Sequence, residues 1–168
     1  SNRLRSQKRN SMQHKCDVIV TYCWNRVGYN ILRSLTSHGV RVWAADTSKI
    51  NICSMSKYCA GSFVYPDPFK EEEAFIQVLK EKIRELCPTV LMPTHDESVV
   101  IMRHRDEFPK ELIIPYENSD KLLLLANKAK STELAQKAGV PVPMIFRSVD
   151  DVANFPVVFK TVIGNSAK

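Results

Sequence analysis

The feature that most constrains the fold of this chain is a repeated alternation of short apolar runs, rich in β-branched residues, with segments of helical periodicity. Residues 17–22 form the first run, and apolar residues then recur at helical spacing from Val27 to Leu35. A second run follows at residues 40–45 and ends at Asp46. This order predicts a strand–helix–strand unit.

The alternation continues through the next seventy residues. An amphipathic helix is predicted before Pro88, because Phe75, Leu79 and Leu86 recur on one face and charged residues occupy the other. Further strands are predicted at residues 61–65, 89–92 and 112–114, with another helix at residues 95–105. Strands that alternate with helices through short loops predict an α/β fold with a doubly wound parallel sheet.

In such a sheet, ligands bind beyond the carboxyl ends of the strands. The loops at residues 22–28, 46–48 and 93–97 follow the first, second and fourth predicted strands. We therefore expect these three loops to share one rim, called the ligand rim below.

The alternation of apolar runs with helical segments ends after residue 117. Two short helices are predicted at residues 120–127 and 130–138, and Gly139 with the prolines after it is a typical helix stop. An apolar run that carries Lys160 then predicts a strand at residues 155–161. We predict four parts: a basic tail, an α/β domain, a helical linker and the truncated start of a second domain, at residues 1–15, 16–117, 118–139 and 140–168.

The positive charge of the chain lies mostly at its beginning. The net charge is +6, and residues 1–15 hold five cationic side chains and no acid. This tail is expected to be solvated or disordered, with an interaction arm as the alternative, and the rest offers no basic stripe for nucleic acid. The cysteines number five and lack disulfide or metal spacing, and no apolar run spans a bilayer, so a cytoplasmic protein is expected.

The ligand rim holds two groups of candidate binding residues. The turn after the first strand lacks the glycines of a dinucleotide fingerprint, so a nicotinamide-dependent oxidoreductase is the third alternative for the function. In that turn Asn25 and Arg26 are candidates for binding an anion, or else belong to a solvated loop. Thr94 with Glu97 matches a capping box, and Asp96 or Glu97 is also placed to anchor a substrate ammonium.

A second group of candidate residues suggests a phosphate-binding site. Lys128 stands at the start of the second linker helix, and Lys160 interrupts an apolar run, where its amine needs an anion or solvent. A loop of small residues follows, with Asn165, Ser166 and Lys168. Such a loop presents backbone N–H groups to phosphate while the lysines supply positive charge.

These segments together resemble the ATP-grasp superfamily, over nearly the whole chain after the tail. Residues 90–97 (Val-Leu-Met-Pro-Thr-His-Asp-Glu) and 103–107 (Arg-His-Arg-Asp-Glu) are similar to the N-terminal, pre-ATP-grasp domain of carbamoyl-phosphate-synthase-like and phosphoribosylglycinamide-formyltransferase-like members. Asn127-Lys128 and residues 139–143 resemble the family's linker. Residues 157–160 and 164–168 resemble the first ATP-binding strand and its phosphate loop, although Thr161 and Ala167 depart from the usual Pro and Gly.

The resemblance implies an ATP-dependent ligase that joins a carboxylate to an amine or a thiol through an acyl phosphate. Lys128, Lys160, Asn165, Ser166 and Lys168 would bind the phosphates of ATP. The family's Mg²⁺ ligands lie downstream of the loop, so no metal ligand is expected in this chain. The intact protein is then an enzyme, and these residues alone are not expected to turn over ATP. The alternative is a stand-alone α/β domain that binds or senses a small ligand without catalysis.

Overall fold

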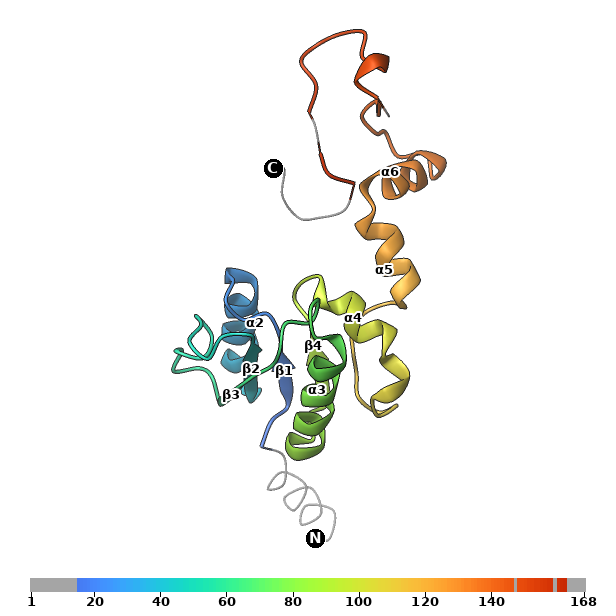
Figure 1. Cartoon of the computed structure of the whole chain (residues 1–168). Coiled ribbons are helices and arrows are strands. Elements are labelled where there is room, and N and C mark those ends of the chain that lie inside the picture. The colour runs from blue at the N-terminus through green and yellow to red at the C-terminus, as the bar shows by residue number, and fades with distance from the viewer. Residues whose placement is uncertain (1–14, 147, 159, 163–168) are drawn as a thin grey trace. The chain divides into compact units, whose positions relative to one another are not determined.

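The computed structural model describes residues 15–146, 148–158 and 160–162, which fall into two compact units. The units divide along the chain between Tyr116 and Glu117. The first contains a sheet with helices packed against it, and the second contains two short helices (Figure 1). The predicted phosphate loop at residues 164–168, and the predicted tail apart from Lys15, lie outside the described residues.

The first unit is built on a sheet of four parallel strands in the order β3-β2-β1-β4. In this sheet β1 is central, because Val18 pairs with Val42 on one side and with Val90 on the other. The strands are β1 (Val18–Val20), β2 (Val42–Asp46), β3 (Gly61–Val64) and β4 (Val90–Met92). The predicted α/β class and these four strands are confirmed.

Five α-helices and two single-turn 3-10 helices are present in the described part of the chain. The α-helices are α2 (Arg26–Ser37), α3 (Glu72–Leu86), α4 (Glu97–Arg103), α5 (Ser119–Ala126) and α6 (Lys128–Lys137), and the 3-10 helices are η1 (Arg105–Glu107) and η2 (Val149–Asp151). The helix predicted at residues 95–105 is therefore shorter, and η1 follows it as a separate turn. Among these helices none has the length and apolar character needed to cross a membrane.

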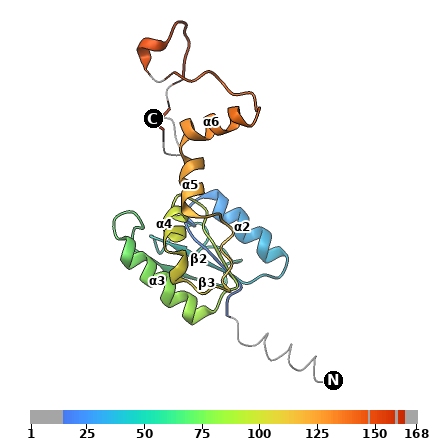
Figure 2. The same ribbon diagram turned by 90° about the vertical axis from the view of Figure 1, so that its right-hand side faces the viewer.

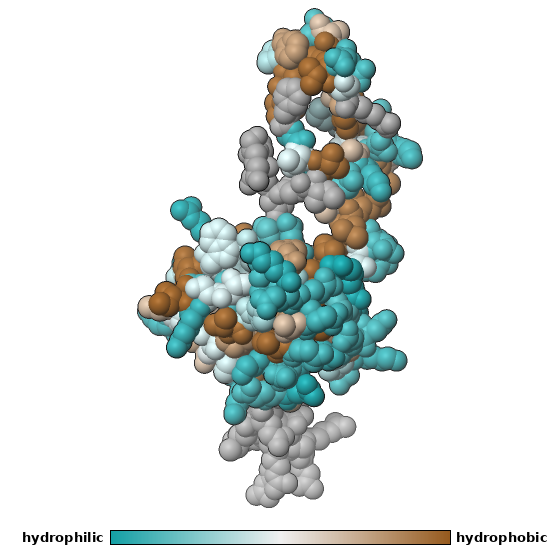
Figure 3. Space-filling model, viewed as in Figure 1, coloured by the Kyte–Doolittle hydropathy of each residue, from teal (hydrophilic) through white to brown (hydrophobic). Residues whose placement is uncertain are grey.

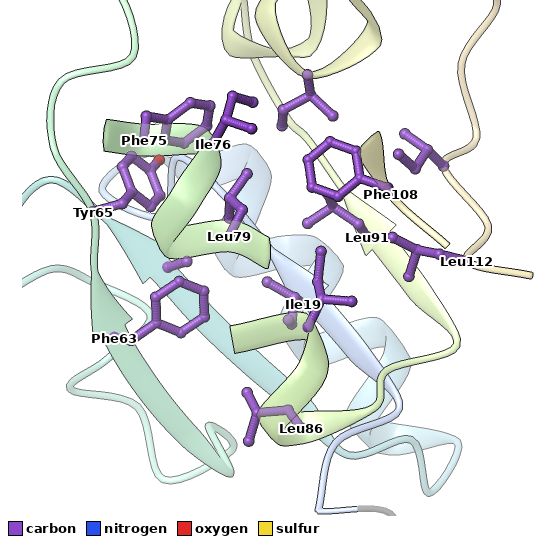
Figure 4. Packing of buried hydrophobic residues seen from close by; sticks show 14 of the residues in the cluster. Ile19, Phe63, Tyr65, Phe75, Ile76, Leu79, Leu86, Leu91, Phe108 and Leu112 are labelled. Carbon is purple, nitrogen blue, oxygen red and sulfur yellow. The ribbon is translucent and has the colours of Figure 1, made fainter. Parts of the chain in front are cut away.

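Successive side chains of a strand point to opposite faces of the sheet, and β1 shows how both faces are covered. Ile19 packs into one cluster with Phe75 and Leu79 of α3, while Val20 packs into another with Leu32 of α2. Figure 2 shows α2 and α3 on opposite sides of the sheet, and Figure 4 shows the α3 side in detail. Burial on both faces explains why β1 is apolar throughout.

The strand predicted at residues 112–114 is wrong, because only one residue of it joins the sheet. Ile113 forms a single parallel bridge with Val90, in which Leu91 N–H donates to Ile113 O at 2.9 Å and Ile113 N–H donates to Thr89 O at 3.0 Å. Pro115 follows almost at once and has no N–H to donate, so the ladder cannot be extended.

The second unit begins with two capped helices. Asn118 caps α5 and Asn127 caps α6, each accepting a backbone N–H at 3.0 Å. These helices confirm the two predicted from the sequence. Apolar side chains of α5 such as Leu125 are exposed, and Figure 3 shows apolar surface on the second unit.

The strand predicted at residues 155–161 is wrong for the described residues of that segment, none of which is in a strand. A strand requires a hydrogen-bonded neighbour. The described part of the second unit contains no strand with which this segment could pair.

Candidate functional site

Hydrogen bonds join the three loops of the ligand rim, as predicted. Thr21, directly after β1, donates its hydroxyl to Glu97 Oε1 at 2.6 Å, and Thr94 Oγ1 donates to Thr21 O at 2.9 Å. On the other side, Trp24 N–H donates to Asp46 Oδ2 at 2.9 Å. Side-chain hydrogen bonds thus connect the carboxyl ends of β1, β2 and β4, and they link the loops of the rim in one network.

Glu97 is the central acid of the rim, and its side chain is fully buried. Its Oε1 accepts from the Thr21 hydroxyl and from Thr94 N–H at 3.1 Å, while Oε2 has no hydrogen-bond partner among the described residues. Burial raises the pKa of Glu97 above its ordinary value, although these hydrogen bonds oppose the shift. A buried acceptor without a partner is costly, so Glu97 is the rim residue most in need of a ligand donor or a water.

The predicted capping box at the start of α4 is confirmed in one half and wrong in the other. Glu97 accepts the N–H of Thr94, as in a capping box. The hydroxyl of Thr94 instead donates to Thr21 O, and the N-cap residue is Asp96, which makes no side-chain capping bond. The Thr94 hydroxyl therefore links β1 to the end of β4, an interaction between distant segments that local sequence spacing does not reveal.

We expect Glu97 to make the stability of the fold depend on pH. Because its folded pKa is raised, the protonated form is favoured on folding, so its contribution is fully present below the unfolded pKa of about 4.5 and is lost as pH rises through the folded pKa. Glu97→Gln keeps an acceptor for Thr21 and Thr94 and removes the titration. The urea midpoint of the variant should therefore exceed that of the wild type by an amount that grows as pH rises from 4.5 to 8. A difference between the two midpoints that stays constant with pH would contradict this prediction.

The backbone of the loop after β1 adopts a conformation that is uncommon for a large side chain. Tyr22 has φ of 57°, in the left-handed region, and its N–H donates to the hydroxyl of Tyr65 at 3.0 Å. Its ring stacks on His95 at a centroid distance of 4.1 Å, and Trp24 meets it edge-on at 5.7 Å. The surrounding side chains hold a strained loop in place, which is a frequent property of ligand sites.

Sequence analysis missed Tyr65, which positions this loop. Tyr65 lies just after β3 and is buried, and burial, with a smaller contribution from Glu97, raises the pKa of its phenol, so the hydroxyl stays neutral. A signal was present in the sequence, since a tyrosine at the carboxyl end of a strand, if buried, carries a hydroxyl that needs a partner.

Tyr65→Phe is expected to destabilise the protein by about 1–3 kcal/mol, because it leaves the N–H of Tyr22 without an acceptor while the ring remains in place. Urea unfolding measures the loss. Tyr58→Phe is the matched control, since Tyr58 is exposed at the surface, and it should change the midpoint little. Equal midpoints for Tyr65→Phe and wild type would show that this hydrogen bond does not stabilise the loop.

The remaining candidates of the rim lie at its surface. Asn25 is the N-cap of α2, and its Oδ1 accepts from Gly28 N–H at 2.9 Å. Arg26 is the exposed first residue of that helix, and Asp96 is exposed with its Oδ2 at 3.7 Å from His95 Nδ1. The structure thus gives Asn25 a capping contact, which occupies its oxygen, and leaves Arg26 and Asp96 accessible to a ligand.

The candidate phosphate-binding lysines lie in the second unit. Lys128 N–H donates to Val162 O at 2.9 Å, and its Nζ donates to Thr161 O at 3.2 Å. The start of α6 therefore contacts the segment that contains Lys160, whose side chain is exposed. Asn165, Ser166 and Lys168 lie outside the described residues. Within the described ranges, no three His, Cys, Asp or Glu side chains come together as metal ligands would.

Solved structures share this fold. The L-amino acid ligase from Bacillus licheniformis aligns with a TM-score of 0.64 and 18% identity over 88% of this chain and 38% of its own. The biotin carboxylase domain of a single-chain bacterial carboxylase aligns with a TM-score of 0.52 and 18% identity, over 75% of this chain and 30% of its own. The biotin carboxylase domain of Hydrogenobacter thermophilus 2-oxoglutarate carboxylase was solved with MgADP, ADP and bicarbonate. It aligns with a TM-score of 0.52 and 13% identity, over 75% of this chain and 28% of its own.

The matched enzymes are much longer than this chain, which spans about a third of their length. No family model matches the sequence. No curated protein matches it either. The biotin carboxylases and the L-amino acid ligase are ATP-grasp enzymes, and the alignments cover their N-terminal portions. The chain therefore has the fold of the N-terminal portion of ATP-grasp enzymes, as its sequence resemblance predicts.

Proposed function

We propose that this chain is the N-terminal part of an ATP-dependent ligase that joins a carboxylate to an amine or a thiol. In this proposal residues 16–117 are a doubly wound pre-ATP-grasp domain, residues 118–139 a helical linker, and residues 140–168 the start of the ATP-binding domain. The observation that carries the proposal is the contact of Lys128 with residues 161–162, in a chain whose fold matches ATP-grasp enzymes. Through that contact Lys128 lies next to the segment that contains Lys160, another of the predicted phosphate-binding lysines.

The reaction proceeds in two displacements. A carboxylate oxygen of the substrate attacks the γ-phosphorus of ATP, and ADP leaves with the electrons of the broken P–O bond. The amine or thiol then attacks the acyl carbon of the acyl phosphate, and inorganic phosphate leaves. Negative charge grows on the transferring phosphoryl oxygens, so Lys128 and Lys160, with Asn165, Ser166 and Lys168, would bind and neutralise the phosphates.

Magnesium is expected for this reaction, as in the MgADP complex of the related biotin carboxylase domain. The described residues of this chain do not fit a metal site, since no cluster of three ligand side chains is present among them. We therefore assign no metal ligand and no metal-dependent step to this chain.

The ligand rim is the proposed place for the substrate that accepts or supplies the acyl group. Glu97 Oε2 lacks a partner among the described residues but is itself buried, so the exposed Asp96 is the better placed of the two candidate acids for a ligand ammonium. Asn25 and Arg26 lie at the start of α2, where an anionic group such as a carboxylate would be favoured. The rim thus offers opposite charges for a small zwitterionic or amide-forming substrate.

A cytoplasmic location belongs to the same proposal. All five cysteines are free thiols, of which three are buried. Free thiols are usual in proteins that work in a reducing compartment.

The test is an assay of the protein at the length that its gene encodes. Sequencing past the codon for Lys168 shows whether a downstream domain with acidic metal ligands follows, and ADP release is then measured with a panel of carboxylates, each with and without amines and thiols. ADP release that depends on both substrates supports the ligase. A stop codon at that point, or no ADP release with saturable ligand binding, would mean that the chain is a binding module without catalysis.

A further inference from the structure

A histidine at the end of α4 lies between two carboxylates that belong to two other elements. His104 directly follows α4, and its side chain is 15% exposed. Its Nδ1 lies 2.6 Å from Oε1 of Glu107, in η1, and its Nε2 lies 2.8 Å from Oε1 of Glu72, the first residue of α3. Both ring nitrogens are therefore in contact with acids.

The number of protons on this ring follows from its two contacts. An ionised carboxylate only accepts hydrogen bonds, whereas a neutral imidazole has one donor and one acceptor nitrogen. Two short contacts to ionised carboxylates therefore require an N–H on each nitrogen, which makes His104 an imidazolium. The hydrogen bond with Glu107, and then that with Glu72, raise the pKa of His104 above its ordinary value, although burial opposes the shift.

Each of the two acids also pairs with a second cation. Oε2 of Glu72 accepts from the Arg103 guanidinium at 2.9 Å, and Oε2 of Glu107 accepts from Lys80 Nζ at 2.7 Å. The hydrogen bonds from His104 and from Lys80 lower the pKa of Glu107 below its ordinary value. Five charges thus alternate in sign along one series of contacts, which we call the His104 network: Arg103, Glu72, His104, Glu107 and Lys80.

The neighbouring charged groups leave this network as the main electrostatic contact of the ring. Arg105 of η1 donates to the carbonyl oxygens of Pro109 and Leu112, at 3.1 and 2.9 Å. Glu73 and Asp106, which precede or follow the two paired acids in the chain, are exposed. A metal site does not explain the cluster, because no group of three His, Cys, Asp or Glu side chains in the described ranges could hold a metal ion.

The network links α3 to the junction of α4 and η1. Ile101 of α4 and Phe108, just after η1, are buried in the same cluster as Phe75 of α3. Figure 1 and Figure 2 both show α4 close to α3. Helix α4 begins at Glu97, the buried acid of the ligand rim, and ends at Arg103, a member of the network. One short helix therefore connects the rim to the network.

We propose that the His104 network is a proton-dependent clamp that holds α4 against α3 and so positions the end of α4 that lies at the rim. The clamp is closed while His104 carries both ring protons and the two glutamates are ionised. When the ring loses one proton, one nitrogen becomes an acceptor that faces a carboxylate oxygen, and that contact becomes repulsive. When a glutamate gains a proton, it no longer attracts the imidazolium. This inference stands whether or not the protein is a ligase.

The clamp is expected to work within a window of pH. Because the folded pKa of His104 is raised, the stability that it contributes is fully present below its unfolded pKa of 6.5 and is lost as pH rises through the folded pKa. Because the folded pKa of Glu107 is lowered, its contribution is present above its unfolded pKa of 4.5 and is lost as pH falls through the folded pKa. The clamp should therefore open as pH rises above the folded pKa of His104, and again in strong acid.

The first experiment follows the ring of His104 by NMR in the 168-residue chain, from about pH 5 to about pH 10. The ring signals are assigned through the backbone, so the wild type alone gives the titration. We expect a midpoint above 6.5, with the nitrogen shifts of a doubly protonated ring on its acidic side. Glu72→Gln and Glu107→Gln should each lower this midpoint, since each removes one negative partner of the ring.

The matched control for these variants is Glu73→Gln. Glu73 is an exposed acid next to Glu72, so its replacement should move the midpoint of His104 far less than Glu72→Gln does. A wild-type midpoint at or below 6.5, or a midpoint that either Glu72→Gln or Glu107→Gln leaves unchanged, would overturn the proposal.

The second experiment measures whether the clamp holds α4. Hydrogen exchange of the α4 amides is compared below and above the His104 midpoint, after correction for the intrinsic exchange rate at each pH. Protection should fall about tenfold above the midpoint, as expected for the loss of one hydrogen bond to a charged group. The measurement is repeated in Glu97→Gln, which removes the titrating side chain at the other end of α4, and the same fall should remain.

Replacements of His104 separate its charge from its size. His104→Arg supplies a permanent cation with several donors, so α4 should keep its protection on both sides of the wild-type midpoint. His104→Gln carries no charge, so α4 should lose protection at every pH. Protection of α4 that is equal below and above the midpoint in the wild type, or a fall in His104→Arg as large as that in the wild type, would overturn the clamp.

Discussion

Replacing Lys128 or Lys160 by alanine in the intact protein is expected to lower kcat/KM for ATP on the order of a hundredfold each. Each substitution removes a positive charge that would stabilise the negative charge growing on the transferred phosphoryl group. Lys160 is exposed and directly precedes Thr161, to which Lys128 Nζ donates at 3.2 Å. Steady-state ADP release measures the loss, and circular dichroism should remain that of the wild type.

Two control variants test whether the loss of activity depends on the position of the lysine and on its positive charge. Lys137→Ala removes an exposed lysine from the other end of α6 and should leave ADP release unchanged. Lys128→Arg keeps the charge and a donor for Thr161 O, so it should retain more activity than Lys128→Ala. ADP release at the wild-type rate from both alanine variants would remove these lysines from the proposed phosphate site.

Phe75→Ala is expected to destabilise the first unit by about 3–5 kcal/mol, since it removes a large buried side chain and leaves a cavity. Phe75 is fully buried on α3, and its ring meets Tyr65 edge-on at a centroid distance of 4.8 Å. That loss is a large fraction of the stability of an ordinary domain, about 5–15 kcal/mol. Urea unfolding measures it, followed by tryptophan fluorescence, to which Trp43 beside the same cluster contributes together with Trp24.

Phe69→Ala is the matched control for this prediction. Phe69 lies a few residues before α3 and is 62% exposed, so its removal should change the unfolding free energy by less than about 0.5 kcal/mol. If Phe75→Ala and Phe69→Ala unfolded at the same urea concentration, the core of Figure 4 would not be what stabilises the sheet against α3.

Much of the first unit was predictable because its elements carry local signals. Neighbouring residues and the periods of strand and helix set the β-branched run at β1, the short apolar run at β2 and the apolar face of α3. The shared rim also followed from the sequence, since the strands are parallel and their carboxyl ends must lie at one edge.

The two strand predictions that failed did so for different reasons. Residues 112–114 have the apolar character of a strand, but Pro115 limits them to one bridge with Val90. Residues 155–161 read as a strand, but no described segment of the second unit pairs with them. Strand propensity describes a side chain that fits a sheet, and it does not supply the neighbouring strand.

The sequence by itself determined the α/β class, the order of the elements and the rim loops, because these depend on periodicity and on residues close along the chain. Only the tertiary structure decided that Glu97 is buried with Oε2 lacking a partner among the described residues, and that Tyr65 holds the loop of Tyr22. Each of these contacts joins loops that follow different strands. Their geometry arises when the sheet brings those loops together, and desolvation then sets the chemistry of the buried groups.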